Sequence, residues 1–225
     1  MNIDQYDVND FVLDWETMGN APEGAIVDLA MVVFNHNPYK LPTFEELCQK
    51  AVRFKFDLKS QKGRRIFDQG TMDWWKKQDP EAQKHLKASP EDIDYTEFYP
   101  KMMEFLGTSG FNKRTGQGWC RGQSFDFPIM IDAIRQIHGT RETFNLEPCF
   151  FWQQRDVRTA VEATLMVRDM TMCPMPKGAL DGFVMHNAIH DCAKAALELI
   201  YSKRYALGLE EIPTGDNVDP RSVRK

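Results

Sequence analysis

Two carboxylates, Asp14 and Glu16, interrupt the otherwise apolar run at residues 11–19. The aromatic and β-branched residues of this run are typical of a buried strand. Because strand side chains alternate, both carboxylates point from one face. Bare carboxylates side by side repel each other and resist desolvation, and a divalent cation between them removes both problems. The pair therefore predicts a metal site suited to phosphoryl chemistry. The alternative, a strand end that emerges into solvent, stays open on this stretch alone.

Two further acidic positions lie far along the chain. Asp126 ends the triplet Ser124-Phe125-Asp126 at the beginning of a predicted helix, where an ordinary helix cap is the alternative role. His186 and Asp191 lie in the last predicted helical segment, residues 180–207. Residues five apart on a continuous helix point about 140° away from each other. His186 can therefore share a site with Asp191 only if it lies in the turn before the helix. A cap or surface role for this histidine also stays open.

Positive charge gathers in residues 50–65, which carry seven Lys or Arg residues against Asp57 alone, although the whole chain has a net charge of −5. This segment predicts either a solvated edge strand and loop or a local phosphate track that includes Lys62 and Arg64. Trp74 and Trp75 follow it. Neighbouring residues on a helix cannot both face the core, so one indole is available to stack on a base or packs partly under a loop.

The elements that must position these residues alternate between strand and helix patterns. The expected strands are 8–18, 24–35, 51–58, 117–122 and 147–152, the first two joined as a hairpin, and the expected helices begin near 71, 89, 123, 156 and 180. The helix from Ser89 is expected to run to Gly107, with Ser89 as its cap. This order favours a three-layer α/β fold with a mixed central sheet flanked by helices.

Composition narrows the class of protein. A chain of 225 residues that is 42% hydrophobic can bury a full core, and we expect one domain over residues 1–225. Neither a membrane-spanning run nor a signal peptide is expected, the latter because residues 1–5 lack its basic and apolar regions. Five scattered cysteines without a C-x-x-C pair predict reduced thiols in a cytoplasmic protein. The negative net charge argues against a protein that coats nucleic acid by bulk electrostatics.

Together, the three motifs resemble the DnaQ-like family of 3′-5′ exonucleases, the DEDD group on a ribonuclease-H-like fold. They occur in the family's order and span residues 14–191. The resemblance implies that two divalent metal ions, Mg²⁺ or Mn²⁺, are bound by four carboxylates, those of Asp14, Glu16, Asp126 and Asp191. His186 stands where the histidine (DEDDh) subgroup keeps its general base. The tyrosine subgroup would have Tyr at 187, where this chain has Asn187.

This resemblance implies a metal-dependent 3′-5′ exodeoxyribonuclease that hydrolyses single-stranded DNA ends to 5′-mononucleotides. An exoribonuclease that trims RNA ends, a non-catalytic nucleic-acid-binding module and a set of purely structural carboxylates are the alternatives. No membrane contact and no obligate protein partner are inferred. The residues expected to contact substrate are Thr17, Met18, Trp74, Trp75, Arg121, Phe125, Lys62 and Arg64.

Overall fold

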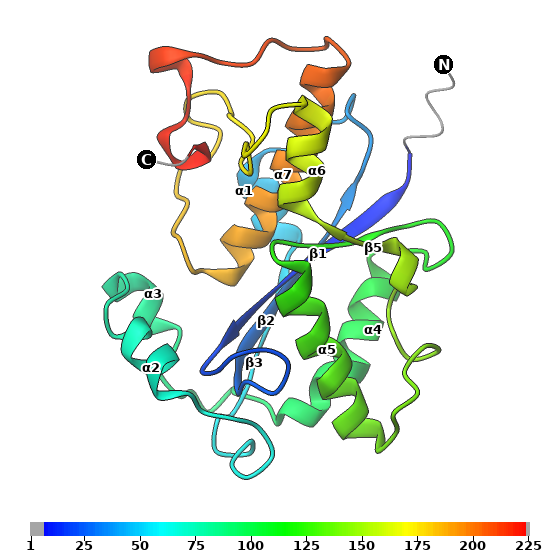
Figure 1. Cartoon of the computed structure of the whole chain (residues 1–225), viewed down its shortest axis with the longest axis vertical. Helices are drawn as coiled ribbons and strands as arrows, with labels where there is room; N and C mark the ends of the chain where they lie inside the picture. The colour runs from blue at the N-terminus through cyan, green and yellow to red at the C-terminus, as the bar shows by residue number, and fades with distance from the viewer. Residues whose placement is uncertain (1–6, 224–225) are drawn as a thin grey trace.

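A mixed five-stranded sheet in the order β3-β2-β1-β4-β5 forms the centre of the computed structural model, which describes residues 7–223 (Figure 1). β1 pairs antiparallel with β2, and β2 with β3, whereas β1, β4 and β5 are parallel. The mixed sheet predicted from the sequence is confirmed. Residues 1–5, on which the signal-peptide expectation falls, lie outside the described residues. The strands are β1 Asn9–Thr17, β2 Ile26–Asn35, β3 Val52–Lys55, β4 Gly118–Cys120 and β5 Gln154–Asp156.

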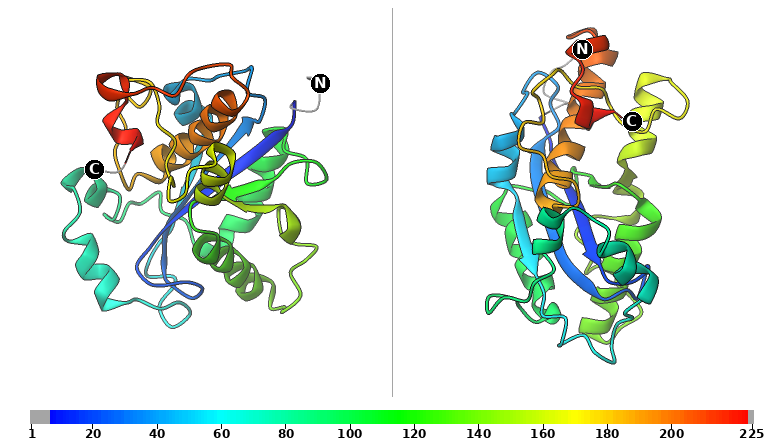
Figure 2. Two further views of the ribbon diagram at one scale, coloured as in Figure 1. Left: turned by 45° about the horizontal axis from the view of Figure 1, so that its top comes forward. Right: turned by 90° about the vertical axis from the view of Figure 1, so that its left-hand side faces the viewer.

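Helices cover both faces of the sheet, and the strands run between them in both views of Figure 2. Val12 of β1 packs with α1 (Phe44–Lys50), α6 (Val157–Leu165) and α7 (Ala188–Ala206). The alternate residues Phe11, Leu13 and Trp15 pack on the opposite face with α4 (Phe98–Thr108) and α5 (Gln123–His138). The alternation of the strand therefore turns Asp14 and Glu16 toward the layer that contains α7.

Two short helices, α2 (Gln69–Trp75) and α3 (Pro80–Lys84), lie beside the carboxyl end of β1. Asp68 and Asp79 cap them, each accepting a hydrogen bond from a backbone amide of the first turn. Trp75 anchors this pair of helices, because its ring is buried against Met18 and its Nε1 donates a hydrogen bond to the carbonyl oxygen of Thr17 at 2.8 Å.

The helix expected from Ser89 begins later, so that prediction is wrong at its start. Ser89 and Pro90 lie in a turn, and the helical segment begins after Asp94, which caps the short 3₁₀ helix Tyr95–Glu97 before α4. The reason is tertiary. The backbone of Ile93 hydrogen bonds to Lys55 and Asp57 at the edge of the sheet and cannot join a helix.

The strand expected at residues 147–152 is also wrong. A 3₁₀ helix, Phe151–Gln153, occupies this position, and β5 follows it at Gln154. The side chains of Phe151 and Trp152 are 64% and 52% exposed rather than buried. Aromatic content alone does not distinguish a buried strand from an exposed loop, because either can be rich in aromatic residues.

Smaller differences concern lengths. β3 is shorter than the expected 51–58, since residues 58–64 form turns, and the last helix begins at Ala188 instead of Leu180. All five cysteines are free thiols. Within residues 7–223, none of the helices has both the length and the apolar character needed to cross a membrane.

Candidate active site

The carboxyl end of β1 meets the beginning of α7, and this junction brings predicted site residues together. Glu16, His186 and Asp191 each offer one ligand atom, and these atoms lie within 4.8 Å of one another. Residues 16 and 191 are 175 positions apart in the sequence but share one half-buried space. The cluster consists of oxygen and imidazole donors, which suits a divalent cation.

His186 lies in the turn that precedes α7, as the spacing requires. Its backbone φ is +61°, in the left-handed region, and Asn187 follows it as the N-cap of α7. Asp191 lies in the first turn of α7 and accepts a hydrogen bond from the backbone amide of His186. A continuous helix would separate these two side chains, and the left-handed residue is what lets them meet.

Asp126 lies in the first turn of α5, outside the group of three within 4.8 Å but near enough for its charge to raise the pKa of Asp14 and of Glu16. Gly122 occupies the N-cap position of this helix, so the alternative of an ordinary capping role for Asp126 is wrong. Instead, the buried Asp126 carboxylate accepts a hydrogen bond from the backbone amide of Trp15 at 3.3 Å. This bond ties the helix to β1 between the two carboxylates of the strand.

The four predicted metal-binding carboxylates repel one another in a space of low dielectric. Burial, followed by the charges of Asp191 and Asp126, raises the pKa of Asp14 well above its usual value. Burial and the Asp14 charge do the same to the pKa of Glu16. Burial raises the pKa of Asp126 and of Asp191 to about 7. Such a set is stable as anions only with a compensating cation, so the donor set fits divalent metal ions.

The imidazole of His186 is held by two indoles. Its ring lies edge to face with Trp74 at a centroid distance of 4.9 Å and with Trp75 at 6.1 Å. Burial lowers the pKa of His186, so the ring is neutral near pH 7 and can accept a proton.

A cavity of about 200 Å³ opens beside this cluster. Of the residues predicted to contact substrate, Thr17, Trp74, Trp75 and Phe125 line it, whereas Met18 is buried and packs with Trp75. Trp74 is 42% exposed and Trp75 is buried, as expected for neighbouring helical residues. The remaining lining residues are Trp15, Glu16, Gly19, Asn20 and Thr71.

The basic segment 50–65 does not form a continuous track. Lys62 and Arg64 are exposed on the turns after β3. Arg65 is buried, donates to the carbonyl oxygens of Pro22 and Gly24 at 2.7 Å each, and pairs with Asp132 at 3.1 Å. The structure therefore leaves Lys62 and Arg64 as phosphate-binding candidates and gives Arg65 a role in the fold.

Arg121 lies near the carboxylates, and its guanidinium is already paired with another acid. It forms an ion pair with the buried Glu198 and donates to the carbonyl oxygen of Thr171 at 2.8 Å. Glu198 also lies 3.9 Å from Lys194. Sequence reasoning missed this network, although the i, i+4 spacing of Lys194 and Glu198 on one helix was its visible signal.

Asp28 of β2 is a further buried acid next to the site. It lies opposite Glu16 in the β1–β2 pairing and is buried. Among the described residues its Oδ1 has no hydrogen-bond partner, and its Oδ2 lies 4.0 Å from Nε of Arg53. Burial raises the pKa of Asp28 to about 7. This acid adds to the negative potential next to the site.

A mixed sheet that presents carboxylates beside a histidine is the arrangement expected of a 3′-5′ exonuclease. A family model for the 3′-5′ exoribonuclease Rv2179c-like domain matches residues 9–200, and the chain belongs to this family. It is 50% identical over 221 residues to the exodeoxyribonuclease of Enterobacteria phage T4, with 95% of this chain and 97% of that protein covered. The sequence-based recognition of this class is confirmed.

Solved structures support the fold. Cell-death related nuclease 4 (CRN-4) superimposes with a TM-score of 0.56 at 13% identity, over 91% of this chain and 65% of that chain. A 3′-exonuclease solved for the recognition of a histone mRNA stem-loop gives the same TM-score of 0.56 at 12% identity, over 96% of this chain and 74% of that chain. At such low identity these similarities establish the architecture alone.

Proposed function

We propose that this exonuclease removes 5′-mononucleotides from the 3′ ends of single-stranded DNA, and that residues 1–225 form one catalytic domain. The observation that carries the proposal is the convergence of Glu16, His186 and Asp191 within 4.8 Å, beside a cavity lined by aromatic side chains. The cavity of about 200 Å³ is smaller than the ~300–1,000 Å³ of sites for drug-sized ligands, which suits one terminal nucleoside. Because a base must leave a duplex to enter it, single strands are the preferred substrate.

Two divalent ions, Mg²⁺ or Mn²⁺, are the proposed cofactors, held by the carboxylates of Asp14, Glu16, Asp126 and Asp191. When bound, such ions neutralise these carboxylates, polarise the scissile phosphate and lower the pKa of the attacking water. Arg121 supports the same carboxylates at longer range, since its charge lowers the pKa of Asp14 and of Asp191. A direct contact between Arg121 and substrate stays a prediction.

His186 is the proposed general base. Its neutral imidazole faces the acidic cluster and takes the proton of the water that attacks the terminal phosphodiester. Trp74 and Trp75 fix the ring, and the left-handed backbone of His186 sets its direction. The backbone at Thr17 and Met18 is proposed to lie along the terminal nucleotide, and Phe125 and Trp74 line the same cavity.

An exoribonuclease activity is the second candidate, because the matching family model carries that description. The relative at 50% identity is an exodeoxyribonuclease, which favours DNA. The deciding experiment incubates matched 3′-labelled and 5′-labelled DNA and RNA oligomers with Mg²⁺, with and without chelator. We expect immediate release of the 3′ label as a mononucleotide, a shortening ladder from the 5′ label, faster DNA turnover, and no reaction with chelator. Immediate release of the 5′ label, or chelator-resistant cleavage, would refute the proposal.

Trp74→Ala is expected to raise the KM for single-stranded DNA by about tenfold or more, because base–aromatic stacking contributes ~1–3 kcal/mol. Steady-state kinetics on a defined oligomer measures this. Trp74→Phe keeps an aromatic face and serves as the matched control, with KM close to that of the parent. Because Trp74 also packs on the His186 ring, kcat should fall as well, and an unchanged KM would remove Trp74 from base stacking.

Lys62→Ala and Arg64→Ala are each expected to weaken single-strand binding and to flatten its salt dependence by about 0.7 in the slope of log K against log salt, the value for one phosphate contact. Binding titrations over a salt series in chelator measure both quantities. Lys84→Ala is the control, because this lysine is exposed on α3 and pairs with Glu81 at 2.6 Å. An unchanged slope in both variants would place the phosphate contacts elsewhere.

A further inference from the structure

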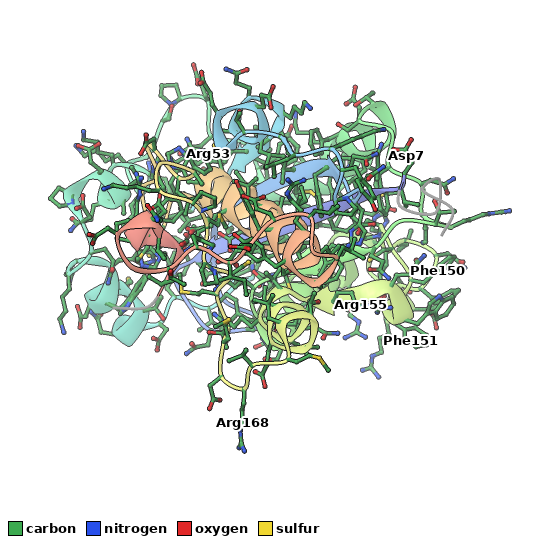
Figure 3. All side chains as sticks on the ribbon, turned by 90° about the horizontal axis from the view of Figure 1, so that it is seen from above. Asp7, Arg53, Phe150, Phe151, Arg155 and Arg168 are labelled. Carbon is green, nitrogen blue, oxygen red and sulfur yellow. The ribbon has the colours of Figure 1, made fainter. Side chains whose placement is uncertain are left out.

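Four aromatic side chains form a cluster before β5, here called the aromatic patch: the exposed Phe144, Phe151 and Trp152 and the half-buried Phe150. Phe150 and Trp152 stack with ring centroids 4.7 Å apart and planes inclined by 14°. Phe144 lies 5.5 Å from Phe150, and Phe151 packs edge to face on Trp152 at 4.8 Å. Figure 3 shows Phe150 and Phe151 at one edge of the molecule. Exposed aromatic side chains gathered in one place make this patch a candidate binding surface.

The loop that carries the aromatic patch is firmly held. The side-chain oxygen of Gln153 accepts a hydrogen bond from the backbone amide of Phe150 at 3.1 Å, and the backbone amide of Gln153 donates to the Phe150 carbonyl oxygen at 2.8 Å. The buried Glu147 accepts from Thr143 at 2.7 Å and from Gln154 at 3.2 Å. The rings are therefore presented in fixed positions, which lowers the entropy lost on binding.

Cations surround the aromatic patch. Nζ of Lys113 lies 4.9 Å above the centre of the Phe150 ring, and Arg155 donates to the Trp152 carbonyl at 2.6 Å. Figure 3 places Arg155 at the same edge as the labelled rings, and Arg114 is exposed next to Lys113. Lys113 also donates to the carbonyl oxygen of Phe144, so both it and Arg155 are held against the loop with their charge beside the rings. Exposed rings such as those of Phe151 and Trp152, combined with lysine and arginine, are typical of surfaces that bind single-stranded nucleic acid by stacking of bases and pairing with phosphates.

We propose that the aromatic patch is a second binding site for the single strand, which holds the part of the substrate on the 5′ side of the end being hydrolysed. This inference rests on the proposed function in so far as the occupant is the enzyme's own substrate. A protein bound at this patch would require apolar surface alone. The flanking cations and the aromatic faces are features that a nucleic-acid strand requires, and they favour the strand as the occupant.

The position of the patch fixes how long the strand must be. Phe11 of β1 pairs with Gly118, and Gly118 pairs with Gln154, so the patch lies beyond the beginning of β1 while Asp14 lies toward its end. At about 3.3 Å per residue along a strand and about 4.8 Å between strands, the separation is on the order of 20 Å. At about 3.4 Å per stacked nucleotide, about six nucleotides bridge the two sites. Shorter oligomers cannot reach the patch.

The test measures binding in chelator, where hydrolysis is absent, for single-stranded DNA of about 30 and about four nucleotides. The double variant Phe151→Leu/Trp152→Leu keeps apolar surface but removes the rings. We expect it to weaken binding of the long oligomer about ten- to hundredfold and to leave the short one unchanged. Phe151→Tyr/Trp152→Phe keeps aromatic faces and is expected to restore parental affinity. Leu209→Ala/Ile212→Ala, which removes two exposed apolar side chains elsewhere, is the control.

Equal losses for both lengths, or none for either, would overturn the proposal. A second contradicting outcome is a change of oligomeric state, measured by sedimentation, in the leucine variant alone and without a change in DNA affinity. The patch would then be an interface between copies of the protein. Failure of the parent to degrade any oligomer with Mg²⁺ would refute the proposed function separately, since the binding comparison does not depend on cleavage.

Discussion

Asp14→Asn is expected to lower exonuclease turnover by about 10³-fold or more and, at the same time, to stabilise the metal-free protein. The loss follows because this carboxylate is proposed to hold the catalytic cations, whose electrostatic contribution is several kcal/mol. The gain follows because burial and the charges of Asp191 and Asp126 oppose the Asp14 anion. The asparagine has the same shape without the charge, so it removes that repulsion.

Two measurements check the opposite signs. Turnover is followed on a labelled single strand, and Tm is recorded with chelator and with Mg²⁺. We expect a Tm in chelator that is higher by about 2–4 °C for each kcal/mol gained. The increase in Tm on adding Mg²⁺, which the parent gains by binding the ion to its folded state, should shrink in the variant.

Asp28→Asn is the matched control, since Asp28 is buried opposite Glu16 and its pKa is raised to about 7. This variant should also gain stability in chelator but should keep turnover within a few-fold of the parent. Loss of activity in both variants would add Asp28 to the metal-binding set. Unchanged activity in Asp14→Asn would remove the first acid of the proposed site.

The placement of the site residues could be predicted from the sequence where it depends on local backbone geometry. The period of a strand places Asp14 and Glu16 on one face, and the pitch of a helix requires His186 to precede it. Both expectations agree with the structure, down to the turn at φ +61°. That these segments meet was implied only by the family resemblance, because no local pattern reports contacts between residues 175 positions apart.

The remaining errors arise where tertiary partners decide. Ile93 does not join the helix expected from Ser89, because its backbone groups form hydrogen bonds at the edge of the sheet. Arg64 and Arg65 are neighbouring arginines that the sequence does not distinguish. Only Arg65 is buried, where it donates to carbonyl oxygens and pairs with Asp132. The exposed rings at Phe151 and Trp152 carry the signal of a buried strand. Sequence patterns report the character of a residue, whereas burial depends on which partners the fold supplies.

His186→Asn is expected to lower turnover by about 10²- to 10⁴-fold, the usual contribution of a general base. Asparagine is the sharper substitution because the residue has φ +61°, a conformation that asparagine adopts readily and alanine does not. The backbone amide that hydrogen bonds to Asp191 should therefore stay in place. Single-turnover rates, the Mg²⁺-induced change in Tm and single-strand affinity in chelator should show that only the chemical step is lost.

Comparison with His186→Ala separates the roles of the ring and of the turn. The alanine variant should lose the same activity and should be less stable than the asparagine variant by about 1–2 kcal/mol, because alanine pays the cost of the left-handed conformation that asparagine largely avoids. His138→Asn, at the exposed end of α5, is the control and should behave as the parent. Near-parental turnover in His186→Asn combined with a large loss in His186→Ala would assign His186 to the conformation of the turn, and the proton would then have to leave by another route.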